Sequence, residues 1–302
     1  MERNIRLDYF KIFLSILVIT IHIQPLLTNN NFWGWCISNG VSRIAVPTFF
    51  IINGFFISSK LNKPNAVKKY IIHLLLIYAV WSVIYAPYFI TNVRLKDIVI
   101  ILFTGYLHLW YLPGVIIGVI LLYLGKRYIK NDLFILILAL LSFVVGYILS
   151  HYMNKLFLYR NGFTIGFAFI VIGYYIESKK IHTIIKNSHL IIVICLTSII
   201  AIFESYYRFV ATSGSWLQDF ILSTLILAPA IFILVMKYPK YVSEKGFMSI
   251  VSSGIYFLHV IAISIIGVSG EYNIYRLIPI LIISALLSYV AYLINKRVKI
   301  FF

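Results

Sequence analysis

The chain has 302 residues, of which 62% are hydrophobic and 12% are charged, and its formal net charge is +17. Soluble domains carry about 25% charged residues, so this composition excludes that class and predicts an all-α polytopic membrane protein. In a soluble protein such a positive charge would indicate nucleic-acid binding. Here, lysines in the loops between membrane spans explain the charge better. We therefore expect the lipid bilayer as a partner, and no nucleic acid.

Apolar segments recur along the chain, each close to the roughly 20 residues that a helix needs to cross a bilayer. They predict a single transmembrane domain over residues 1–302, built as a bundle of about ten transmembrane helices. The first segment follows Arg3 and Arg6 as in a signal peptide, but it lacks a small-residue cleavage site, so we expect a retained span. The stretch 98–103 is too short to cross and is expected to be interfacial or re-entrant. The expected spans are 7–27, 41–58, 70–90, 107–124, 133–150, 162–176, 190–206, 216–236, 250–268 and 277–295.

Lysine and arginine are concentrated in every second loop between these spans. The rich segments are the N-terminus and the stretches 60–69, 126–130, 179–186, 237–245 and 296–299. Because positively charged loops stay in the cytoplasm, this alternation places both termini there. An even number of spans agrees with that orientation.

The first span carries an acid, a base and an imidazole within a segment that should be purely apolar. At about 100° per residue, Asp8, Lys11, Ser15, Val18 and His22 share one narrow helix face. Ionisable groups inside a membrane normally face the protein interior or a wet cavity. The sequence therefore predicts a polar stripe that runs from the cytoplasmic surface past the membrane midplane.

Other polar residues fall on the opposite, outer side of the predicted membrane. Tyr256 and His259 share a face of span 250–268. Several of the outer residues are expected to converge on one cavity. The outer set consists of His22, Arg43, His108, Arg160 and Glu204.

Five sequence motifs, in this order, resemble those of the acyltransferase 3 family of membrane proteins. That family contains bacterial O-acetyltransferases of surface and secreted glycans, and the resemblance covers nearly the whole chain. The motifs are Asp8, Lys11 and His22; the segment Arg43-x-x-Val46-Pro47-x-Phe49-Phe50 with Gly54-Phe55; His108-Leu-Trp110-Tyr-Leu112; Arg160-Asn-Gly162 before an aromatic span; and Gly254-Ile-Tyr256-x-x-His259.

The resemblance implies an O-acetyltransferase of the bacterial cell membrane. Acetyl-CoA would be the cytoplasmic donor substrate rather than a bound cofactor, and the acceptor would be a hydroxyl of a glycan or lipid-linked saccharide. His22 would act as general base, since a neutral imidazole suits proton transfer near pH 7. Arg43 or Arg160 would stabilise the oxyanion. The catalytic set is completed by Asp8, Lys11 and Glu204.

Binding residues follow from the same resemblance. Many family members carry an Arg-x-x-Arg pair after the second span, where this chain has Tyr70-Ile-Ile-His73, so the donor's phosphates would be left mainly to lysines. The expected donor-binding residues are Lys11, Lys68, Lys69 and His73, and the expected substrate-binding residues are His108, Trp110, Tyr256 and His259. Cys36 and Cys195 show no metal-ligand spacing, so no metal is expected.

Each of these residues also has a simpler interpretation. Asp8 and Lys11 can neutralise each other at the interface, and His22 can form an interhelical hydrogen bond. Arg43 can anchor its span at the headgroups. The remaining alternatives are an aromatic belt for His108 and Trp110, a pair with Arg208 for Glu204, and packing for Tyr256 and His259.

Two other functions stay open at this stage. Buried charges also suit a small-molecule transporter, and a similar membrane domain is fused to some amino-acid racemases, where it is thought to bring in serine. However, the sequence shows no internal repeat of the kind common in carriers. A non-catalytic partner in polysaccharide assembly is the other function, and a homo-oligomer is compatible with each of the three.

Overall fold

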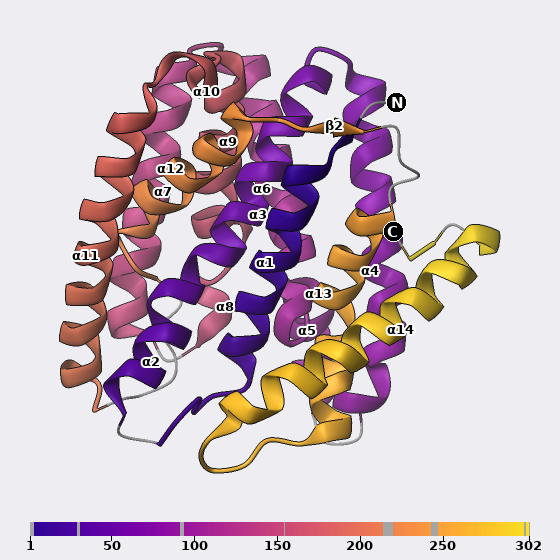
Figure 1. The fold of residues 1–302 in the computed structure, drawn as a ribbon. Coiled ribbons are helices and arrows are strands. Elements are labelled where there is room, and N and C mark those ends of the chain that lie inside the picture. The colour runs from indigo at the N-terminus through magenta and orange to yellow at the C-terminus, as the bar shows by residue number, and fades with distance from the viewer. Residues whose placement is uncertain are drawn as a thin grey trace. The chain divides into compact units, whose positions relative to one another are not determined.

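The computed structural model describes residues 3–28, 31–90, 94–153, 155–213, 220–242, 247–298 and 300–301. Within these residues the fold is helical apart from one pair of two-residue strands, which confirms the predicted all-α class (Figure 1). The chain divides into two compact units. Unit 1 comprises residues 1–49 and 182–300, and unit 2 comprises residues 50–181 together with Phe301. Helices α3 (Ala45–Ile57) and α10 (Ile181–Ile184) contain the positions where the chain changes unit.

Unit 1 is organised around three helices, α1, α13 and α14, which lie against one another (Figure 1). Ile19 and Ile23 of the α1 segment and Ile255 of α13 are almost completely buried in their shared core. The unit also contains the 3₁₀ turns η1 and η5 and an antiparallel pair of helices, α11 and α12. Its elements are β1 (Arg3–Asn4), α1 (Ile5–His22), α2 (Phe32–Asn39), η1 (Val41–Ile44), α11 (Asn187–Ala211), α12 (Thr224–Lys237), β2 (Tyr241–Val242), α13 (Phe247–Ile266), η5 (Asn273–Arg276) and α14 (Leu277–Val298).

At one end of unit 1, three segments that the sequence assigns to the cytoplasm meet. β1 pairs antiparallel with β2, and the amide of Ile5 donates to the carbonyl of Lys240 at 2.9 Å. Lys237 donates to the carbonyl of Ile185, and the guanidinium of Arg6 lies 5.7 Å from the centre of the Tyr238 ring. This gathering agrees with a common side of the membrane for the three segments.

At the other end of unit 1, the segment after α1 is tied to the segment after α13. The amides of Tyr272 and Ile274 donate to the carbonyls of Leu27 and Leu26 at 2.8 and 3.0 Å. α1 and α13 therefore run parallel, each starting at the strand pair. Consecutive spans of a membrane protein run in opposite directions, so two parallel spans must be separated by an odd number of other spans. The predicted order satisfies this condition, because it makes α1 the first span and α13 the ninth.

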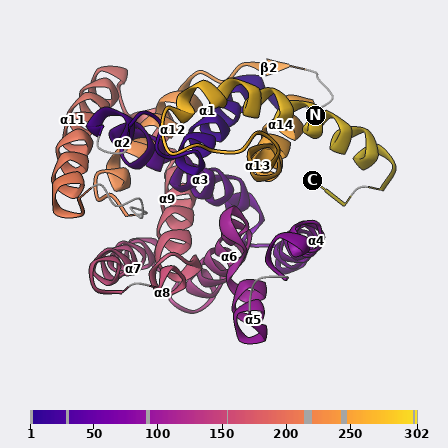
Figure 2. The ribbon, with the colours of Figure 1, turned by 90° about the horizontal axis from the view of Figure 1, so that it is seen from below.

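Unit 2 is a helical bundle in which α6, α7 and α9 pack against one another (Figure 2). Its elements are η2 (Ser58–Lys60), α4 (Pro64–Phe89), α5 (Leu95–Thr104), η3 (Leu107–Trp110), α6 (Tyr111–Tyr128), α7 (Asp132–Tyr152), α8 (Leu156–Tyr159), the π-helix η4 (Gly162–Gly166) and α9 (Phe167–Ser178). A Cβ atom at Gly54 would collide with the carbonyl of Ile170 in α9. The backbones of α3 and α9 therefore approach as closely as only glycine permits, as is typical of membrane helices.

Eight helical segments of the described chain are long and apolar enough to cross a membrane, which confirms a multi-pass membrane protein. They are Phe32–Lys60, Pro64–Phe89, Leu107–Tyr128, Asp132–Tyr152, Leu156–Ser178, Asn187–Ala211, Phe247–Ile266 and Asn273–Val298. Helix α12 is apolar but has only 14 residues, and α1 carries Arg6, Asp8 and Lys11. The count of ten spans, the single domain and the cytoplasmic termini stay predictions.

Some expected segments differ from the observed ones. The stretch 98–103 lies within α5, which has 10 residues and is too short to span. The expected span 216–236 begins with residues 216–219, which lie outside the described residues, as do residues 243–245 and 299 of the predicted basic segments.

Candidate functional site

The polar stripe of the first span lies on one helix, α1, as predicted. Asp8 is buried, and its carboxylate lies 3.7 Å from the ammonium group of Lys11. The hydroxyl of Ser15 lies 3.0 Å from the carbonyl of Ser252 in α13 and 3.0 Å from that of Lys11. The ion pair between Asp8 and Lys11, which was the simpler interpretation of these residues, is therefore present. Their role in catalysis stays a prediction.

Two histidines lie next to each other at the far end of this stripe. His22 is the last residue of α1, and the centre of its ring is 5.0 Å from that of His259 in α13. His259 is completely buried, and its Nδ1 lies 2.6 Å from the carbonyl oxygen of Tyr256. A carbonyl can only accept a hydrogen bond, so Nδ1 carries the proton. In the neutral ring of His259, Nε2 then holds the lone pair.

A chain of hydrogen bonds connects Arg43 to the carbonyl that precedes His22. The guanidinium of Arg43 donates to Oδ1 of Asn39 at 2.5 Å, and Nδ2 of Asn39 donates to Oε1 of Gln24 at 2.9 Å. Nε2 of Gln24 then donates to the carbonyl of Ile21 at 3.0 Å. All three side chains are buried. Because each of these side chains is bonded to the next, the position of the guanidinium is fixed relative to the end of α1.

Hydroxyl groups make a second connection between α1 and the segment that carries Arg43. Thr20 donates to the carbonyl of Leu17 at 2.7 Å, so the proton in its 2.7 Å contact with Ser42 comes from Ser42. Ser38 donates to the carbonyl of Thr20 at 3.1 Å. Because these groups are buried, unmade hydrogen bonds would be costly, and the network holds α2 and η1 in register with α1.

Glu204 has a clear structural task in unit 1. Its carboxylate accepts the amides of Leu222 and Ser223 at 2.7 and 3.0 Å and the hydroxyl of Ser223 at 3.0 Å. Ser223 precedes the first residue of α12, where a negative charge is favourable. From its sequence position, Glu204 is expected to act in catalysis or to pair with Arg208, and neither expectation includes these bonds. The catalytic role of Glu204 stays a prediction.

In unit 2, the structure brings together three of the expected site residues. The guanidinium of Arg160 lies 5.3 Å from the centre of the Trp110 ring, a cation–π arrangement. His108 is buried and meets the ring of Tyr85 edge-on at 5.0 Å. Asn161 accepts the amides of Phe163 and Thr164 at 2.9 and 3.2 Å and so caps η4 behind Arg160. Two of the five motifs therefore form one cluster in this unit.

The expected donor-binding residues of α4 lie on the surface of unit 2. Lys68, Lys69 and His73 are exposed on the first turns of this helix. Between Lys69 and His73, Tyr70 donates to Asn53, whose amide in turn donates to Tyr111 at 2.5 Å. The exposed residues are available to a ligand, whereas Tyr70 is part of the packing of unit 2.

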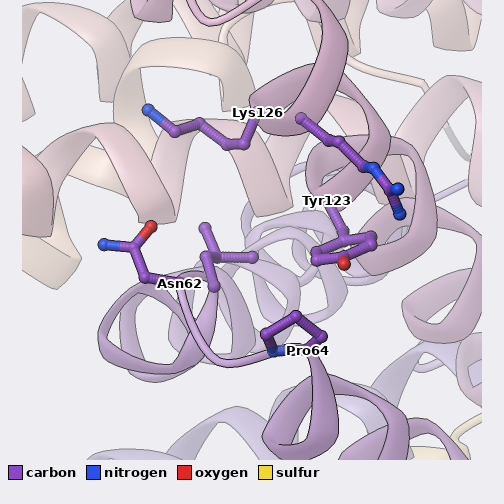
Figure 3. Close-up of a pocket in the computed structure, with 6 residues that line it drawn as sticks. Asn62, Pro64, Tyr123 and Lys126 are labelled. Carbon is purple, nitrogen blue, oxygen red and sulfur yellow. The ribbon is translucent and has the colours of Figure 1, made fainter.

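A pocket in unit 2 lies between the start of α4 and the end of α6. It has a volume of about 380 Å³ and is lined by Leu61, Asn62, Pro64, Tyr123, Lys126 and Arg127. Figure 3 shows the side chains of Asn62 and Lys126 on one side of it and the ring of Tyr123 above Pro64. None of these six residues is among the expected site residues.

Within the described ranges, no three His, Cys, Asp or Glu residues are grouped so that they could hold a metal ion. The chemistry that the two units offer is instead that of imidazole, guanidinium and ammonium groups. His22 and His259 can exchange and orient protons, and Arg43 presents a fixed positive charge.

Sequence reasoning missed the amides and hydroxyls that hold these groups, namely Gln24, Asn39, Ser38, Ser42 and Thr20. The one available signal was the spacing of Asn39 and Arg43, which differ by four positions. It is obscured because Gly40 separates α2 from η1. A Cβ atom on Gly40 would collide with the carbonyl oxygen of Cys36 in α2 and would lie 2.6 Å from the hydroxyl of Ser205 in α11, so this position leaves room only for glycine.

Comparisons with known proteins bear on what this arrangement does. A model of the acyltransferase 3 family, described as an acyltransferase domain, matches residues 4–294. No solved structure matches the chain.

Three curated relatives match parts of the chain. An amino-acid racemase of Enterococcus faecalis is 32% identical over 201 residues, which cover 57% of this chain and 28% of that protein. A second amino-acid racemase of the same organism is 36% identical over 135 residues, or 40% of this chain and 19% of that protein. A serine/alanine racemase of Enterococcus gallinarum is 27% identical over 137 residues, with the same two coverages of 40% and 19%.

This chain therefore matches at most 28% of the length of these relatives. The family match, in contrast, covers residues 4–294, and several described helices are long and apolar enough to cross a membrane. The chain belongs to the acyltransferase 3 family, and it is a multi-pass membrane acyltransferase.

Proposed function

We propose that this acyltransferase transfers an acetyl group from acetyl-CoA to a hydroxyl of a cell-surface or exported glycan, with His22 as the general base. The observation that carries the proposal is the position of His22, beside the buried His259 and at the end of the hydrogen-bond chain from Arg43. Family membership supports acyl transfer. The acetyl donor, the glycan acceptor and a bacterial cell membrane with cytoplasmic termini follow from the motif resemblance.

In the proposed reaction, His22 takes the proton of the acceptor hydroxyl. The hydroxyl oxygen attacks the thioester carbonyl and forms a tetrahedral intermediate. The carbon–sulfur bond then breaks, and the proton on His22 passes to the leaving sulfur of CoA. Transfer is direct, because the proposed catalytic set contains no cysteine. Atoms and charges balance without a metal or a redox partner.

His259 would orient His22 in this scheme. Its Nδ1 proton is directed at the Tyr256 carbonyl, so its Nε2 can accept a hydrogen bond from the His22 ring. A ring nitrogen of His22 that donates to His259 leaves the other nitrogen with the lone pair that a general base needs. His259 therefore acts as a positioning residue rather than as a substrate ligand.

Arg43 would stabilise the negative oxygen of the tetrahedral intermediate. Such stabilisation depends on donors that are fixed before the reaction. Asn39 and Gln24 provide that fixation, because the chain they form ends on the carbonyl of Ile21 next to the proposed base. Arg160, which lies over Trp110, would serve the acceptor together with His108.

The donor's phosphates would be attracted by the positive charges of Lys11, Lys68, Lys69 and His73. Lys68 and Lys69 are exposed, and a lysine acts on phosphate as a point charge. Transport of an amino acid has no comparable support. The racemase relatives are named for racemisation, and only 19–28% of their length corresponds to this chain.

The test is acetyl transfer from labelled acetyl-CoA in membranes that contain the native protein, His22→Ala or the control His189→Ala. His189 is an exposed residue at the start of α11 and has no proposed role. We expect loss of the general base to slow transfer by about 10²–10⁴-fold, with no change in the control. Undiminished transfer by His22→Ala would overturn the assignment of the base. Uptake of an amino acid without dependence on CoA would favour transport instead.

A further inference from the structure

The pocket between α4 and α6 is formed by residues that the proposed reaction does not use. Its volume of about 380 Å³ falls within the range typical of small-molecule sites, about 300–1,000 Å³. The lining combines two cations, Lys126 and Arg127, with an amide, a tyrosine and a proline. This mixture of positive charge and flat apolar surface resembles a site for an anion attached to an apolar or aromatic group.

The positive charge of the pocket is held in place by a carboxylate behind it. Oδ1 of Asp132 lies 2.6 Å from the ammonium group of Lys126 and accepts the Tyr174 hydroxyl at 2.9 Å. Its other oxygen lies 3.6 Å from the ammonium group of Lys179. Asp132 therefore orients two lysines and neutralises only one of their charges. Arg127 adds a further charge on the pocket wall.

The start of α4 contributes to the same field. Pro64, in the pocket wall, is the first residue of this helix, which has 26 residues. The N-terminal end of a helix carries partial positive charge. Asn62 also lines the pocket, and the ring of Tyr123 lies over Pro64 (Figure 3). An anion in the pocket would meet positive potential from the start of α4 and from the side chains of Lys126 and Arg127 on α6.

We propose that this pocket binds a phosphate ester group. The guanidinium of Arg127 offers paired N–H donors that match two phosphate oxygens, which a lysine cannot do. Lys126 would add positive charge to the pocket, and the ring of Tyr123 would cover the adjoining part of the ligand. One source of this phosphate is the acyl donor CoA, and that source rests on the proposed function. The other is the headgroup of an anionic lipid, which does not.

Binding of CoA to the full chain tests the first source. The protein is reconstituted in phosphatidylcholine nanodiscs and titrated calorimetrically with CoA and with 3′-phosphoadenosine 5′-phosphate. Arg127→Gln is compared with Lys130→Gln, which removes an equal charge from an exposed residue that follows α6 and does not line the pocket. We expect Arg127→Gln to weaken binding about tenfold or more, as loss of a hydrogen bond to a charged group implies. Arg127→Lys should restore part of the affinity.

Native mass spectrometry of the same variants tests the second source by counting bound phosphatidylglycerol. A loss specific to Arg127→Gln in either ligand supports the pocket and identifies the origin of the phosphate. Equal binding of both ligands by Arg127→Gln and Lys130→Gln would overturn the proposal. Neither measurement requires turnover. A protein that binds through Arg127 but transfers no acetyl group would therefore refute the proposed function and leave the phosphate site standing.

Discussion

The polar group around His22 and the pocket around Lys126 hold their charges in opposite ways. Around His22 in unit 1, Arg43 is 8% exposed and Asn39 is fully buried, and neutral amides connect the charge to the backbone. Around Lys126 in unit 2, the side chains of Lys126 and Asp132 retain 26% and 20% exposure and form a direct ion pair.

The two regions are therefore expected to respond differently when a side chain loses its partner. A buried polar group that loses its hydrogen bond bears the full desolvation penalty, about 1–3 kcal/mol. An exposed ion pair contributes only about 0–1 kcal/mol, because water replaces the missing partner. Chemistry that depends on fixed geometry suits the first region. A binding site that must exchange its ligand with water suits the second.

The largest effect is expected from Asn39→Leu, which breaks the series of hydrogen bonds between Arg43 and Gln24. A displacement of about 1 Å at a reacting group can slow catalysis about 10²-fold, so kcat should fall by that order while KM for acetyl-CoA changes little. Steady-state kinetics measure both. Ser38→Ala is the matched control, because Ser38 is equally buried but bonds only to the Thr20 backbone. Equal losses of kcat in both variants would mean that this series of hydrogen bonds supports folding alone.

An intermediate effect is expected from His259→Phe, which keeps a ring at this position and removes both nitrogens. If His259 orients His22, kcat should fall about tenfold or more, since general-base catalysis depends on a correctly placed lone pair. The thermal unfolding midpoint in detergent should change little, because the aromatic contacts with Tyr256 are kept. Full activity of His259→Phe would show that His259 only packs. His189→Phe, at an exposed residue of α11 with no proposed role, serves as the control.

The smallest effect is expected from Lys126→Met in the pocket region. Asp132 keeps Lys179 as a partner, so the free energy of unfolding should change by less than about 1 kcal/mol. Chemical denaturation in detergent measures it, with Lys179→Met as the matched variant. A loss of several kcal/mol would show that the ion pair behaves as a buried one, and the contrast between the two regions would fail.

Much of the helical architecture could be predicted because a membrane demands long apolar segments. The stripe from Asp8 to His22 was also readable, since helical geometry alone puts these residues on one face. The approach of His22 to His259 was not. Its prediction requires knowing that α1 and α13 run parallel and pack together, although most of the chain lies between them.

The bonds of Glu204 show a second limit of sequence reasoning. Arg208, one helical turn away, was the obvious partner, yet the carboxylate binds the start of α12. Local spacing identifies neighbours on the same helix but gives no account of where the chain returns. The amides Gln24 and Asn39 escaped notice for a related reason. A neutral amide in an apolar span attracts attention only when its partners are known.

The ties at both ends of α1 have a mechanical consequence. β1 is paired with β2 just before α13, and Leu26 and Leu27 are bonded to the residues that follow it. These bonds hold together the segments at both ends of the two helices, and the ring centres of His22 and His259 lie 5.0 Å apart. In the proposed reaction, the acceptor hydroxyl would therefore have to reach His22 at the end of α1 that is bonded to the segment after α13.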